Sequence, residues 1–402
     1  MERQLPMHVL GYLADPSCTK PADDSLTVEY RLLSSGVIYR RIIGDWSKSE
    51  AARFLLAPPL MLYAAGRPLD GYPLELLLSF KVAQETETTQ TSGTPTTSVI
   101  FYPDSEVARD LAALLTLLCR RLITVSGKSK EQHAIYPYPE FGHTPLPVVT
   151  SMRRIFWPPL PATVLTSIDR QEIHDNNPPP LAVDPTALTA LLTGLPRAQY
   201  AESIVASARL YALALELIRE QPDLSYQLLI SAVETIANEA LRSFQPDADE
   251  KVQHQRVVFD LVKNLGIEDE AARKVAIAAC KGEHWATRKF KKFLTDNIDE
   301  SIWDSEDDLF KILPKLVPPR DQLQKTLGKI YDARSKATHF GREFPASGSY
   351  AGGPMIPVRL VASLWGSEPI FPPVVWLERV VNSAIRRFWE RSIPESSDAP
   401  AP

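Results

Sequence analysis

Arg334 and His339 are the two residues whose types and spacing best fit a chemical role. Four residues separate them in the run Tyr331-Asp-Ala-Arg-Ser-Lys-Ala-Thr-His339. Arginine stays charged and binds phosphate through two parallel N–H donors, whereas histidine takes up or releases a proton near neutral pH. Together they could cleave RNA without a metal ion. Histidine would deprotonate the 2′-hydroxyl or protonate the leaving oxygen, and arginine would stabilise the charge developing on the phosphate.

The same pair also has a purely structural interpretation. His339 would be a cation in the last turn of a helix, where the helix dipole favours positive charge, and Gly341 would end that helix. Five positions turn about 140° around an ideal helix. Arg334 and His339 would therefore converge only if the helix ends near His339 or if a partner subunit supplies the second residue.

An acidic residue and two basic segments could serve such a site. Glu234 lies in a helical pattern and would either orient or neutralise one of the pair, or face solvent or a lysine. Segment 281–292 holds five basic residues against one acidic residue, and segment 318–342 holds six against two, in a chain of net charge −5. The segments are either solvated helix faces or a phosphate-binding surface. Three aromatic residues in or directly after the first segment would either stack on bases or belong to the core: Trp285, Phe290 and Phe293.

Proline divides the chain into two parts that must position these residues. Of 35 prolines, only Pro222 and Pro246 fall between residues 198 and 313. Proline breaks helix interiors and central strands, so this stretch favours long helices. The sequence predicts an α+β N-terminal domain followed by an all-α helical bundle. The predicted boundaries are 1–195 for the first domain with a proline-rich linker at its end, 196–395 for the bundle, and 396–402 for a disordered tail.

Hydrophobic spacing predicts the individual elements. In the first part we expect a hairpin of strands 26–33 and 37–43, an exposed loop over 84–97 and a helix from Asp104 to about Leu118. In the second part the apolar periodicity and the helix stop signals predict seven helices, over 200–220, 223–240, 250–264, 269–280, 286–294, 318–339 and 374–391.

Composition excludes several classes of protein. The net charge of −5 excludes a wholly basic nucleic-acid coat protein, and no apolar run reaches transmembrane length. The first residues do not resemble a secretory signal. The three cysteines (Cys18, Cys119 and Cys280) fit neither a disulfide framework nor a zinc site. We therefore expect a cytoplasmic protein with no membrane contact, no metal site and no cofactor.

The run around Arg334 resembles a known family signature. Ala333-Arg-Ser-Lys-Ala-Thr-His339-Phe-Gly, followed by Phe344-Pro345, is similar to the Arg-x4-6-His motif that ends a late helix of HEPN domains, in particular Apea-like ones. The resemblance extends to the run Leu228–Ile236 that carries Glu234, to Phe290-Lys-Lys-Phe293, and to the closing Trp376-Leu-Glu-Arg helix. It covers about residues 198–392 and implies an HEPN-like bundle that forms a homodimer.

Catalytic members of this family are metal-independent endoribonucleases, often in phage defence or toxin–antitoxin systems. For this chain we expect attack by the 2′-hydroxyl of the RNA, which would leave a 2′,3′-cyclic phosphate. The resemblance implies that Arg334 binds phosphate, His339 is the acid or base, and Glu234 orients one of them. The predicted RNA contacts around these residues are Ser335, Lys336, Thr338, Arg342, Lys289 and Lys292. The N-terminal domain would sense a phage or antitoxin trigger.

One residue departs from the family pattern. Active members commonly carry Asn, Asp or His directly after the arginine, and Ser335 stands there in this chain. A serine hydroxyl cannot take a full proton at neutral pH. The alternative expectation is therefore an HEPN-like domain without catalytic activity, which serves as an RNA- or protein-binding and dimerisation module.

Overall fold

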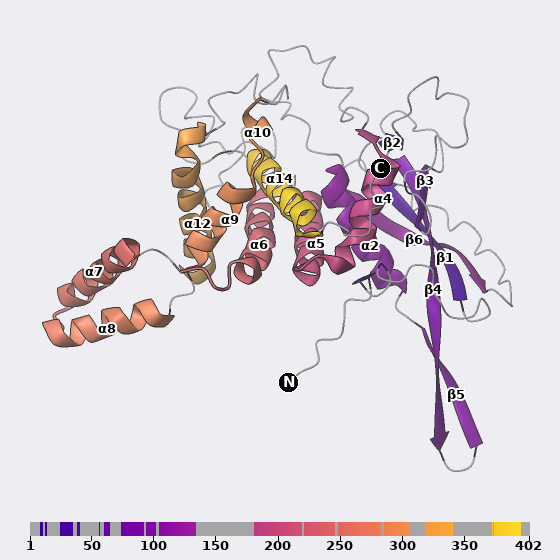
Figure 1. Cartoon of the computed structure of the whole chain (residues 1–402), viewed down its shortest axis with the longest axis horizontal. Coiled ribbons are helices and arrows are strands. Elements are labelled where there is room, and N and C mark those ends of the chain that lie inside the picture. The colour runs from indigo at the N-terminus through magenta and orange to yellow at the C-terminus, as the bar shows by residue number, and fades with distance from the viewer. Residues whose placement is uncertain are drawn as a thin grey trace.

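The structure of the chain is a computed structural model. It describes residues 9–10, 13, 25–34, 38–40, 56, 60–64, 74–91, 94–101, 104–133, 181–218, 221–245, 248–282, 285–304, 318–340, 372 and 374–394. A sheet with one long helix comes first in the chain, and a set of helices follows (Figure 1). The order agrees with the prediction of an α+β part followed by a helical part. Most of the predicted proline-rich linker and the whole of the tail 396–402 lie outside the described residues.

An antiparallel sheet forms the N-terminal part. Its central path runs β3-β4-β1-β6, and β5 pairs with the far end of β4. Side chains at alternate positions of β1 are buried (Val28, Tyr30 and Leu32), as the two-residue period of a strand requires. The strands are β1 (Ser25–Ser34), β2 (Ile38–Arg40), β3 (Met61–Ala64), β4 (Leu74–Thr91), β5 (Thr94–Phe101), β6 (Ile123–His133) and β7 (Leu181–Val183).

Two predictions about these strands are wrong. Strand β1 does not form a hairpin with the next strand, because β4 and β6 occupy its two edges, and β2 pairs in parallel with β7 instead. The described residues of the segment 84–97 are not a loop, because Gln84–Thr91 continues β4 and pairs with β5, which begins at Thr94. Threonine is frequent in this segment and is β-branched, which favours extended backbone even where the sequence is polar.

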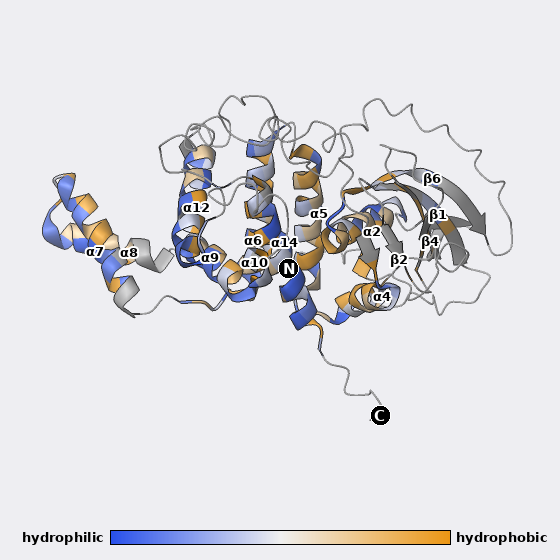
Figure 2. Ribbon diagram, turned by 90° about the horizontal axis from the view of Figure 1, so that it is seen from above, coloured by the Kyte–Doolittle hydropathy of each residue, from blue (hydrophilic) through white to orange (hydrophobic). Residues whose placement is uncertain are grey.

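Helix α2 (Asp104–Cys119) lies between the sheet and the helical part (Figures 1 and 2). From Leu111 to Cys119 every side chain is buried, on all sides of the helix. A helix that is apolar all round must be covered all round. The sheet covers one side of α2 and helix α5 (Ala201–Leu217) covers another, so the apolar core runs without a break from the sheet into the bundle.

The helical part confirms the predicted helices to within a few residues. Helix α9 packs against α6, α12 and α14, and therefore lies at the centre of the bundle. The elements besides α5 are α4 (Pro185–Gly194), η5 (Leu195–Arg197), α6 (Pro222–Ala240), α7 (Ala248–Asn264), α8 (Asp269–Gly282), α9 (Ala286–Asn297), α10 (Ser301–Asp304), η7 (Arg320–Gln322), α12 (Leu323–Phe340) and α14 (Val374–Ser392).

Helices α7 and α8 form a helical hairpin that projects from the bundle beyond α12 (Figures 1 and 2). They pack mainly against each other. Large apolar side chains on the hairpin are exposed, among them Val252, Leu261 and Leu265 at 61–78%. The hairpin is thus attached to the body without sharing its core. None of the helices that the structure describes is both long and apolar enough to cross a membrane.

Candidate active site

Helices α6 and α12 bring Glu234 and Arg334 together. The apolar face of α6 is buried through Val233 and Ile236, which places Glu234 at the edge of that face. Arg334 Nη2 lies 2.8 Å from Glu234 Oε2, and the two side chains are only 22% and 14% exposed. The carboxylate therefore holds the guanidinium in one place and neutralises its charge.

Tyr331 completes this cluster and was not among the residues predicted for the site. Its hydroxyl donates to Glu234 Oε1 over 2.5 Å, and its ring centre lies 5.8 Å from Arg334 Cζ. Burial, and then the hydrogen bond to the charged Glu234, raise the pKa of Tyr331 well above its usual value. Tyr331 is therefore a neutral hydrogen-bond donor. Its position one helical turn before Arg334 is the sequence signal that could have identified it.

The cluster rests on the core of the bundle. The Tyr331 ring contacts the ring of Phe290 at 5.3 Å between centres, and Phe290 and Phe293 are buried. Trp285 is buried as well and stacks against Arg288, whose Cζ is 4.7 Å from the ring centre. These aromatic residues thus belong to the core or its edge, which decides between the two predicted roles in favour of packing.

His339 lies on a different face of α12. Helix α12 ends at Phe340, one residue after His339, so the whole interval from Arg334 to His339 is helical and its five positions turn the two side chains about 140° apart. His339 is exposed. It belongs to a row of exposed residues at intervals of three and four positions, namely Lys325, Lys329, Asp332, Lys336 and His339. One copy of the chain therefore does not bring Arg334 and His339 to a common point.

The predicted RNA-binding residues have different surroundings. The predicted direct RNA contact is wrong for Lys289. Its side chain is only 8% exposed, because the bundle encloses it. Lys292 is exposed and pairs with Asp296 at 2.9 Å. Lys336 and Thr338 are exposed and Ser335 is half-buried. The last predicted contact, Arg342, and the pair Phe344-Pro345 lie outside the described residues.

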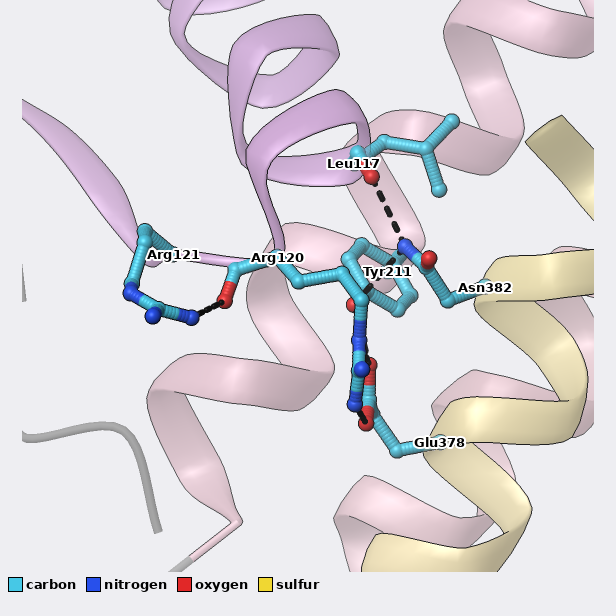
Figure 3. Close-up of polar contacts among 6 residues, drawn as sticks. All are labelled: Leu117, Arg120, Arg121, Tyr211, Glu378 and Asn382. Carbon is cyan, nitrogen blue, oxygen red and sulfur yellow. Dashed lines mark hydrogen bonds and ion pairs between the residues drawn. The ribbon is translucent and has the colours of Figure 1, made fainter. Parts of the chain in front are cut away.

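A second polar cluster, also missed by the sequence analysis, joins the N-terminal part to the bundle (Figure 3). Glu378 of α14 is fully buried and accepts hydrogen bonds from Arg120 Nε at 3.3 Å and Nη2 at 2.7 Å. The hydroxyl of Tyr211 on α5 donates to the same carboxylate. Asn382 Nδ2 donates to the Leu117 carbonyl at 2.7 Å. The end of α2 is thereby tied to α5 and α14.

This junction depends on an unusual backbone conformation. Arg120 follows the last residue of α2 and has a φ of 49°, in the left-handed region that few residues other than glycine adopt. The turn directs the guanidinium into the bundle. Burial, and then the charge of Glu378, raise the pKa of Tyr211 well above its usual value, so Tyr211 stays a donor to that carboxylate.

Among the residues that the structure describes, no group of three or more His, Cys, Asp or Glu side chains is arranged to hold a metal ion. Comparison with known proteins adds no assignment: no protein-family model matches the chain, and neither does any curated protein or solved structure.

Proposed function

We propose that residues 196–395 form an HEPN-like domain that dimerises and cleaves RNA without a metal ion. The observation that carries this proposal is the state of Arg334, which Glu234 and Tyr331 hold at the edge of the bundle while His339 stands exposed on the same helix. A held guanidinium and an accessible imidazole are the two groups that this reaction needs.

The proposed reaction uses the hydroxyl group of the RNA itself. The 2′-oxygen attacks the neighbouring phosphorus and the bond from phosphorus to the 5′-oxygen breaks, which yields a 2′,3′-cyclic phosphate and a 5′-hydroxyl end. Arg334 binds the phosphate oxygens as their charge increases. His339 removes the proton of the 2′-hydroxyl or donates one to the 5′-oxygen.

A dimer would supply the two groups from different copies. Because about 140° separates Arg334 from His339 on α12, a complete site requires Arg334 of one copy to face His339 of the other. A twofold axis generates two such sites, since each copy contributes one arginine and one histidine.

The exposed row on α12 supports an RNA ligand. Lys325, Lys329 and Lys336 extend along the same face as His339, with Asp332 as the acidic member of the row. Lysines in a row attract the phosphate backbone irrespective of sequence.

We propose that the N-terminal part controls access to this site in bacterial phage defence or a toxin–antitoxin response, since the Arg120–Glu378 contact connects it to the bundle.

The alternative is an HEPN-like module that binds RNA or protein without cleaving it. The ion pair of Arg334 with Glu234 favours this second function, because it already compensates the charge that would bind phosphate. Ser335 favours it too, since active members of the resembled family commonly carry Asn, Asp or His there.

Cleavage of cellular RNA in excess EDTA tests the proposal. Wild type should produce 2′,3′-cyclic phosphate ends, and Arg334→Ala and His339→Ala should each abolish cleavage. Lys274→Ala is the matched control, because Lys274 is an exposed lysine on the projecting hairpin. Absence of cleavage by wild type would favour the binding module, and cleavage that survives both substitutions would place the site elsewhere.

Mixing the two inactive variants tests the composite site. If each site takes Arg334 from one copy and His339 from the other, a mixed dimer has one complete site and one doubly defective site. Half of the dimers are mixed after exchange, so activity should return to about a quarter of wild type. A site within one copy would stay inactive in every mixture.

A further inference from the structure

A cavity of about 490 Å³ lies beside the Arg120–Glu378 junction, away from the Arg334 cluster. One wall is a face of α14 whose residues follow helical spacing: Arg379, Asn382, Ser383, Arg386, Arg387 and Glu390. The remaining described lining consists of Arg120 at the end of α2 and of Asp299, Ser301 and Ile302 at α10. The volume falls within the range of small-molecule sites, about 300–1,000 Å³.

Arginine dominates this cavity. Four arginines and two carboxylates line it, and Glu378, which pairs with Arg120 at 2.7 Å, compensates one of the four positive charges. The arginine side chains are partly withdrawn from water, with exposures of 30% for Arg120, 38% for Arg386 and 37% for Arg387. Charged groups that lose water need compensation by opposite charge.

The two acidic residues of the cavity lie beyond hydrogen-bond distance of the guanidinium groups of Arg386 and Arg387. Arg386 Nη2 and Glu390 Oε1 are 3.9 Å apart, as are Arg387 Nη1 and Asp299 Oδ2, and neither distance is a hydrogen bond. Arg387 Nη1 instead donates to the carbonyl of Ile298 at 2.9 Å. Within the described part of the chain, Arg386 Nε is buried and has no hydrogen-bond partner.

The positive charges also act on one another. Burial, and then the charge of Arg120, lower the pKa of Arg379. An anion placed among these arginines would offset their mutual repulsion and supply oxygen atoms that accept their hydrogen bonds. Guanidinium groups match phosphate oxygens best, because their planar N–H donors bind two oxygens at once.

We propose that this cavity binds a small phosphorylated molecule, whose phosphoryl group is held by Arg379, Arg386 and Arg387. Ser383 offers a hydroxyl group on the α14 wall. Its Oγ already accepts from the Asp299 N–H at 3.1 Å, so its own hydrogen remains for a ligand oxygen. The proposal does not rest on RNA cleavage, since none of these residues belongs to the Arg334 cluster.

Both parts of the chain line this cavity. Arg120 comes from the end of α2 and the other three arginines come from α14. A phosphoryl group held by the three α14 arginines would therefore lie next to the junction of Arg120 with Glu378 (Figure 3). Binding should raise the melting temperature of the whole protein, since a ligand of the folded state stabilises that state.

Isothermal titration of the full chain with sodium pyrophosphate, ATP and inorganic phosphate tests the proposal at constant ionic strength. We expect saturable binding of pyrophosphate or ATP with a Kd below about 1 mM. The double variant Arg379→Gln/Arg386→Gln should weaken binding at least about tenfold, because it removes two charge-assisted contacts. The control Lys274→Gln/Arg391→Gln removes the same charge from exposed positions and should bind like wild type.

Without ligand, the double variant should melt at the wild-type temperature or above it, because it removes the Arg379 charge that repels Arg120. Arg386→Lys, which keeps the charge and loses the planar donors, provides a milder second test and should also weaken binding.

The Arg334→Ala variant should bind pyrophosphate normally, which separates this proposal from the nuclease. Absence of saturable binding, equal binding by the double variant, or binding of an RNA oligonucleotide alone would each overturn the proposal.

Discussion

Glu234 receives hydrogen bonds from two side chains of a neighbouring helix, and this makes it the residue on which the geometry of Arg334 depends. The carboxylate uses a separate oxygen for each donor. Removing one donor leaves the other contact, whereas removing the carboxylate releases both.

Tyr331→Phe should lower the free energy of unfolding by about 1.5–3 kcal/mol, the contribution of a hydrogen bond to a charged group. The ring and its contact with Phe290 stay in place. Urea unfolding measures the change. Tyr200→Phe is the control, because among the described residues the Tyr200 ring contacts Phe388 while its hydroxyl has no hydrogen-bond partner. Equal losses for the two variants would contradict the role of the Tyr331 hydroxyl.

Cys119 should resist alkylation in the folded protein at pH 8.5. Burial raises the pKa of its thiol from near 9 to about 12, against a smaller opposing effect of Arg386 and Arg121. The reactive thiolate is therefore scarce. The peptide that contains Cys119 should stay unlabelled under native conditions and become labelled in urea, as read by mass spectrometry. Equally fast labelling in both conditions would contradict the burial of this side chain.

The same pKa shift has a consequence for stability. Folding favours the protonated thiol, so its contribution is complete below the unfolded pKa near 9 and is lost as the pH rises towards 12. Cys119→Ala should therefore reduce the fall in unfolding free energy between pH 9 and pH 12, measured relative to wild type. An unchanged slope would assign the alkaline loss of stability to other groups.

At the scale of elements, the charged contact between the end of α2 and α14 depends on one carboxylate, that of Glu378. Glu378→Gln would leave Arg120 without its counter-charge. We expect a loss of about 3 kcal/mol in unfolding free energy, at the low end for a buried pair, since 30% of the Arg120 side chain stays exposed. Glu390→Gln on the same helix should change stability by less than about 1 kcal/mol, because Glu390 is 47% exposed. Similar losses for both variants would contradict this prediction.

The helices could be predicted from sequence because their signals are local. Apolar spacing, Pro222 and the stop at Gly266 delimit α6 and α7 to within a few residues. Strand pairing was not predictable in the same way. Strand β1 pairs with β4 about 50 residues away rather than with its neighbour in sequence. The match of two alternating apolar faces decides this pairing, and no single segment contains that information.

The candidate site was predictable only in part, for the same reason. Glu234 and Arg334 could be named from their segments, and the structure brings their side chains together. The separation of His339 from Arg334 was predictable too, because a helix that Gly341 ends turns the two residues about 140° apart, and α12 ends at Phe340. Glu378 stood beside the apolar positions Trp376 and Leu377, yet its partner Arg120 lies 258 positions earlier, so local patterns could not identify the pair.

At the scale of the whole molecule, the hairpin of α7 and α8 is a separate unit of stability. No described side chain of α7 is buried, and in α8 only Ala272 and Ala276 are buried among the described side chains. Local opening costs little where few apolar contacts hold an element. Hydrogen exchange measured by mass spectrometry should show faster exchange in α7 and α8 than in α5 and α6. Equal protection of all four helices would contradict an isolated hairpin.

The junction between Arg120 and Glu378 also fixes an order of events during synthesis. Ribosomes add about 5–20 residues per second, so the 258 positions between the two residues correspond to roughly 10–50 seconds. Throughout this interval the sheet and α2 have been synthesised, but α14, which carries Glu378, has not. A nascent chain that stops before Val374 therefore leaves open the apolar faces of α6 and α9 that α14 covers, and such truncated chains should be bound by chaperones and degraded.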